Sequence, residues 1–74
     1  MTYIVIELQT NTDGTVGNLV YAYTDRYQAE QKYHLVLAAA AVSALPVHAA
    51  VLLTGDGRLV ASMAYRHGEN AEEE

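Results

Sequence analysis

Residues 25–46 read DRYQAEQKYHLVLAAAAVSALP, and they predict one long helix in the middle of the chain. Thr24 or Asp25 can cap the start of this helix, because a short side-chain oxygen accepts hydrogen bonds from the free amides of the first turn. The helix is expected to run to about Leu45. Pro46 then stops it, since the residue before a proline is disfavoured in helical backbone.

The segment before the helix predicts two strands. Residues 2–10 alternate in the period-two pattern of a half-buried strand. A loop rich in Asn, Asp and Gly follows at residues 11–18, and residues 19–24 resume as a second strand rich in Val and Tyr. In the first strand the even-numbered apolar residues are expected to face the core: Ile4, Ile6 and Leu8.

The segment after the helix predicts a second hairpin. Residues 47–54 and 58–66 are strand-like, and Gly55, Asp56 and Gly57 between them supply the backbone angles of a tight turn. The predicted fold is therefore α+β in the order ββαββ, with one helix packed on an antiparallel sheet. Residues 1–67 are expected to form this single domain.

Charge and composition exclude several classes of function. The 74 residues include 4 Lys plus Arg against 9 Asp plus Glu, a net charge of −5 that disfavours a DNA or RNA partner. The chain has no Cys, which excludes disulfides, a thiolate nucleophile and Cys-ligated metals. Neither a signal peptide nor a membrane span is indicated. Four of the acids lie within residues 68–74, which we expect to form a disordered acidic tail.

The predicted helix is apolar on two sides. At about 100° per residue, one face is expected to pack on the sheet: Ala29, Tyr33, Val36, Leu37, Ala40 and Ala44. From residue 35 onward the opposite side is apolar as well: Leu35, Ala38, Ala39, Val42 and Leu45. A chain this small cannot surround a helix, so we expect a second copy to cover that side, in a homodimer or a higher oligomer. The alternative is that alanine is simply the best helix former and that some of these side chains stay exposed.

Catalytic and metal-binding patterns are weak. The serines have no recognisable nucleophile context, and His34, His48 and His67 fall in three elements without metal-ligand spacing. Glu7 is the only acidic residue inside a predicted strand, and it is expected on a solvated face of the sheet. We therefore expect a non-enzymatic protein with no metal and no cofactor.

Tyrosine is the unusual residue type, with six Tyr and neither Phe nor Trp. A tyrosine ring can stack on a ligand while its hydroxyl stays polar, and an arginine fork can hold a phosphate, so together they suit a nucleotide-type ligand. The candidate ligand-binding residues are Tyr21, Tyr23, His48, Arg58, Tyr65 and Arg66. The alternative places the tyrosines at sheet edges and a dimer seam with arginines on the rim, and His48 as a hydrogen-bonded interface residue.

Three segments carry a resemblance: residues 29–34 (AEQKYH), residues 35–43, and residues 47–52 (VHAAVL). They resemble a group of proteins of about this length encoded by phages and mobile elements of Gram-positive gut bacteria, and the similarity extends over residues 3–67. The resemblance implies an accessory protein that acts against host defence in the cytoplasm of a bacterial host. It supplies no catalytic motif to carry over.

Two functions fit these observations. The first is an oligomer that sequesters a cyclic or ADP-ribose-type nucleotide signal in a pocket between subunits. The alternative is a protein–protein inhibitor of a host defence protein, or a structural dimer without a small-molecule ligand. An enzyme that degrades such a signal ranks third, because no acid–base pair is visible in the sequence.

Overall fold

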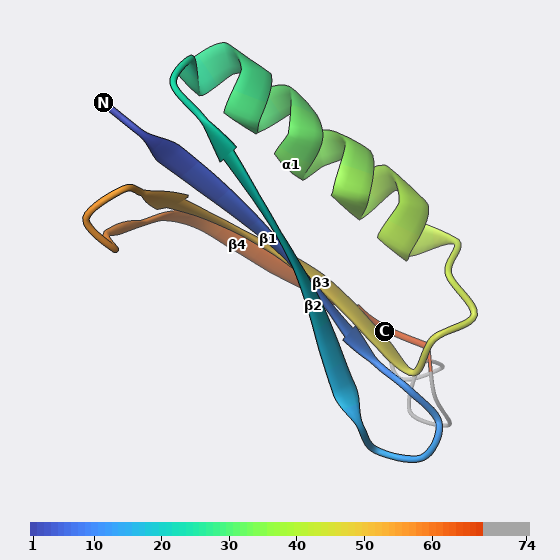
Figure 1. Cartoon of the computed structure of the whole chain (residues 1–74). Coiled ribbons are helices and arrows are strands. Elements are labelled where there is room, and N and C mark those ends of the chain that lie inside the picture. Colours follow the sequence, from blue (N-terminus) through green and yellow to red (C-terminus); the bar gives the residue numbers. More distant parts are fainter. Residues whose placement is uncertain (68–74) are drawn as a thin grey trace.

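One antiparallel sheet and one helix make up residues 1–67, the part of the chain that the computed structural model describes (Figure 1). The elements follow in the order β1 (Tyr3–Thr10), β2 (Val16–Tyr23), α1 (Arg26–Ala41), β3 (Val47–Thr54) and β4 (Leu59–Arg66). This arrangement confirms the predicted α+β class and the ββαββ order. The predicted acidic tail at residues 68–74 lies outside the described residues.

The two hairpins lie side by side in one sheet with the strand order β2-β1-β3-β4. Each hairpin supplies one central strand and one edge strand, and all neighbouring pairs are antiparallel. Strand β2 begins three residues before the predicted position, because Val16, Gly17 and Asn18 pair with the end of β1. Helix α1 lies across one face of the sheet, mainly over β3 and β1 (Figure 1). None of the described elements covers the other face.

The two ends of α1 have different determinants. At the start, Asp25 Oδ1 accepts a hydrogen bond of 2.8 Å from the backbone amide of Tyr27, as expected of an N-cap. The helix ends at Ala41, so the prediction that it runs to about Leu45 was wrong. The Val42 and Ser43 amides donate to carbonyls three residues back, at 3.3 and 3.2 Å, and this tighter turn ends the regular helix before Pro46 is reached.

The predicted inward face of β1 was also wrong. Val5 is 0% exposed and lies in register between Tyr21 and Leu52, so the odd-numbered positions face the helix. Ile4 and Ile6 flank Val5 in the sequence, and three consecutive apolar residues give no period-two signal that separates the faces. The even-numbered residues Ile4, Ile6 and Leu8 therefore lie on the face away from α1.

The core lies between α1 and the two central strands. The helix contributes Ala29, Tyr33, Val36, Leu37 and Ala40, as predicted from their spacing, and the strands contribute Val5, Ala50 and Leu52. Ala44 is exposed, because the helix has already ended at that point. Within residues 1–67 no helix combines the length and the apolarity needed to cross a membrane.

Candidate functional site

The side of the sheet away from α1 is apolar over most of its area. We call it the open sheet face, and the pairing registers place the following residues on it: Ile4, Ile6, Leu8, Thr10, Val16, Asn18, Val20, Ala22, Val47, Ala49, Val51, Leu53, Leu59, Ser62, Ala64 and Arg66. Every position from Ile4 to Leu8 and from Val47 to Leu53 on this face is aliphatic. An antiparallel sheet with a solvated face normally alternates apolar and polar residues, so this pattern is typical of a face covered by another layer.

The outer side of α1 carries a second, smaller apolar surface. We call it the outer helix stripe, and it consists of Leu35, Ala38, Ala39 and Val42, all of them exposed in the protomer. These are four of the five residues predicted to form an oligomer interface. The fifth, Leu45, lies beyond the helix end and is half-buried in the connection to β3. The protomer thus presents two uncovered apolar surfaces on opposite sides.

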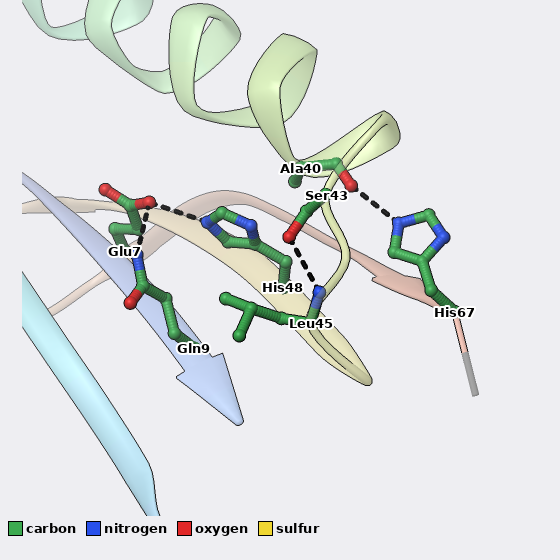
Figure 2. A network of polar contacts seen from close by, with 7 residues as sticks. All are labelled: Glu7, Gln9, Ala40, Ser43, Leu45, His48 and His67. Carbon is green, nitrogen blue, oxygen red and sulfur yellow. Dashed lines mark hydrogen bonds and ion pairs between the residues drawn. The ribbon is translucent and has the colours of Figure 1, made fainter. Parts of the chain in front are cut away.

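A largely buried hydrogen-bonded pair, His48 with Glu7, lies on the helix-facing side of the sheet (Figure 2). His48 Nε2 is 2.6 Å from Glu7 Oε2, and Gln9 Nε2 donates to the same oxygen at 2.9 Å. His48 is 5% exposed and the Glu7 side chain is 13% exposed. The expectation that Glu7 is solvated was therefore wrong: the β1–β3 register turns its odd-numbered position toward the helix.

Hydrogen bonding sets the ionisation of Glu7. Burial acts to raise the pKa of its carboxyl group, but the hydrogen bonds from His48 and Gln9 outweigh burial and hold that pKa below its ordinary value. Because the carboxylate oxygen accepts, Nε2 of His48 carries the shared proton. Among the described residues Nδ1 of His48 has no hydrogen-bond partner. Because Glu7 lies on β1 and His48 on β3, the pair tethers these two strands to each other.

A groove of about 280 Å³ lies between the edge strand β2 and α1, and we call it the β2–α1 groove. Its lining residues are Tyr23, Gln28, Gln31, Lys32 and Leu35. Lys32 Nζ lies 4.1 Å from the centre of the Tyr21 ring, within the range of a cation–π contact. Arg26 lies on the same helix, but its guanidinium is paired with Glu30 at 2.8 Å.

Five of the six predicted ligand-binding residues divide between the two edges of the sheet, and the sixth, His48, lies on the central strand β3. Tyr21 and Tyr23 are on β2 beside the groove, whereas Tyr65 and Arg66 are on β4 and Arg58 immediately precedes β4. Roughly 14 Å of sheet separates these edges. One small ligand therefore cannot contact both groups within a protomer.

The strand β4 residues have other neighbours. Tyr65 lies opposite His48 in the β3–β4 pair, and its ring stacks on that of His67 with 6.2 Å between the centroids. The His67 Nε2 donates to the Ala40 carbonyl at 2.6 Å, which ties the end of β4 to the end of α1 (Figure 2). Arg66 belongs to the open sheet face at its corner. These contacts give Tyr65 and His67 a structural role.

Sequence reasoning missed the polar side of the groove. Gln28, Gln31, Lys32 and Leu35 follow the spacing i, i+3, i+4 and i+7, which places them along one side of a helix. That signal was present in the sequence, but the side of α1 that lies next to β2 depends on the sheet order. The groove is therefore a property of the assembled fold.

Neither metal ligation nor known relatives identify the site. In the stretch from residue 1 to residue 67 no three His, Asp or Glu side chains converge in a way that would hold a metal ion. Comparison of the chain with protein-family models, with curated proteins and with solved structures finds no match. The function is therefore inferred from the geometry of the protomer.

Proposed function

We propose that this chain is a non-enzymatic binding protein that holds a small anionic ligand with an aromatic ring, of nucleotide type, in the β2–α1 groove. The observation that carries the proposal is the position of Lys32, whose ammonium lies 4.1 Å from the Tyr21 ring centre at a groove that Tyr23 also lines. A cation next to aromatic rings is the combination that such a ligand requires.

Four of the five lining residues have distinct parts in this proposal. The half-buried Tyr23 offers a ring on which a base stacks. Lys32 supplies a point charge for a phosphate, and its contact with Tyr21 keeps the ammonium near the groove. The side-chain amides of Gln28 and Gln31 have both donors and acceptors for the edge of a base.

Binding fits this groove better than catalysis does. In the described part of the chain, the groove lining contains no carboxylate and no histidine, the side chains that most often act as general acids or bases. The carboxylate–imidazole pair of Glu7 with His48 is separate from the groove lining and lies largely buried under α1. In the setting that the resemblance to phage accessory proteins implies, the bound molecule would be a nucleotide immune signal and the protein would sequester it.

The proposal is tested by isothermal titration calorimetry with ADP-ribose and with a cyclic dinucleotide. The Lys32→Gln variant is expected to weaken binding roughly tenfold, because a charge-assisted contact to phosphate is lost. Tyr23→Leu is expected to weaken it by a similar factor through loss of stacking. Higher salt also weakens the binding of the wild type.

The matched control is Arg58→Gln, which removes one positive charge at the opposite edge of the sheet and leaves the groove intact. It is expected to bind like the wild type. The proposal fails if the wild type binds neither nucleotide, or if Arg58→Gln weakens binding as much as Lys32→Gln.

The outer helix stripe favours the second candidate function, inhibition of a protein target. Val42 is 86% exposed at the helix end. Leu35 is also exposed, and it lies at the border of the stripe, where it forms part of the lining of the β2–α1 groove. A protein inhibitor using this surface would retain its effect in the Lys32→Gln variant and lose it in Val42→Glu. The two variants together therefore separate a small-molecule ligand from a protein target.

A further inference from the structure

We propose that two copies of this chain pack against each other through the open sheet face, in a two-fold dimer whose layers are helix, sheet, sheet and helix. This interface differs from the outer helix stripe that the sequence favoured. It is also separate from the β2–α1 groove, which lies on the helix side of the sheet. A failure of ligand binding in the groove would therefore not contradict the dimer, and a monomer would not contradict ligand binding.

The first argument is the residue pattern of the two central strands. From Val47 to Leu53, His48 is the only polar residue of β3, and β1 contains the apolar run from Ile4 to Ile6. Strands that are apolar on both faces are those of sheets buried on both faces. Helix α1 covers one face, and no described element covers the other (Figure 1).

The second argument is the area of the open sheet face. Four strands of eight residues form a sheet of roughly 26 by 19 Å. Two such faces in contact bury about 1,000 Å² or more, which reaches the size that a specific interface needs. Twisted sheets of this kind pack about 10 Å apart with their strands rotated by about 30°, so the surface suits a second sheet.

The third argument identifies the second layer as another copy. A two-fold axis brings each patch against itself, so a self-associating surface must not repel its own charge. On the open sheet face of residues 1–67, Arg66 is the single charged residue, and it lies at a corner opposite Val47, the first residue of β3. The outer helix stripe is smaller, with two alanines among its four residues, and a contact confined to it buries much less apolar area.

The experiment compares two matched variants by sedimentation equilibrium. Val20→Glu lies on the open sheet face opposite Ile6, and Val42→Glu lies on the outer helix stripe. Both valines are exposed in the protomer, at 60% and 86%, so the fold accepts either glutamate. We expect the wild type and Val42→Glu to be dimers. Val20→Glu is expected to raise the dimer dissociation constant roughly a hundredfold or more, because the axis buries two unpaired carboxylates.

Circular dichroism of each variant verifies the fold. If Val20→Glu fails to fold, Leu59→Glu replaces it as an open-face variant at the opposite edge of the sheet. A folded Val20→Glu or Leu59→Glu monomer alongside a Val42→Glu dimer supports the proposal. A monomeric wild type overturns it, and so does a dimer that Val42→Glu dissociates while an open-face variant stays dimeric.

Discussion

The imidazole of His48 lies 2.6 Å from the carboxylate of Glu7, although 41 positions separate the two residues in the chain. Glu7 is on β1 and His48 on β3, and the two hairpins of the fold meet along this strand pair. The contact is therefore a polar tether between the two hairpins, largely shielded from solvent under α1.

Removing the histidine from this pair should destabilise the protein. In His48→Ala the Glu7 carboxylate keeps its burial but loses its closest partner, which is expected to lower the free energy of unfolding by about 2 kcal/mol. The measurement is the midpoint of urea unfolding at neutral pH. His34→Ala is the matched control, because His34 is exposed on α1 and its loss should change stability by less than about 0.5 kcal/mol. Equal effects of the two substitutions would contradict the tether.

The same pair predicts a dependence of stability on pH. The pKa of Glu7 in the folded protein is below its ordinary value of 4.5, so the unfolded chain binds the proton more readily. This contribution to stability is complete above pH 4.5 and is lost as the pH falls through the folded pKa. The Glu7→Gln variant lacks the contribution at every pH, so between neutral pH and about pH 3 it should lose less stability than the wild type. The prediction would be contradicted if the urea midpoints of the wild type and of Glu7→Gln fell by the same amount over this pH range.

Local signals predicted the elements well. The turn at Gly55, Asp56 and Gly57 and the cap at Asp25 depend on residues that are close in the chain, and both are found where expected. Gly57 has a φ of 93°, a backbone conformation that other residues rarely adopt, so its position in the turn was readable from its residue type.

Features that depend on strand order were not predictable in the same way. Ile4, Val5 and Ile6 are all apolar, so the sequence does not say which of them faces the helix, and the wrong choice placed Glu7 in solvent. The pairing of Glu7 with His48 requires the β1–β3 register, which no local pattern contains.

The same reason applies to the candidate site. The sequence identified Tyr21 and Tyr23, but it grouped them with Tyr65 and Arg66, which the strand order β2-β1-β3-β4 places at the other edge. Lys32 is a site residue because α1 lies beside β2 in the fold, which brings its ammonium to the Tyr21 ring. In the proposed dimer both grooves face outward, so each copy would hold its own ligand.

The central claim is that the open sheet face joins two copies, and one distance tests it most directly. The chain has no Cys, so Ala39→Cys, on the exposed outer helix stripe, introduces a single site for a spin label. Stacked helix, sheet, sheet and helix layers place the two labels about 30 Å apart or more in a double electron–electron resonance experiment. A dimer joined through the helices would bring the helix axes to about 8–10 Å and the labels to less than about 20 Å. That short distance, or no dipolar coupling at all, would contradict the account.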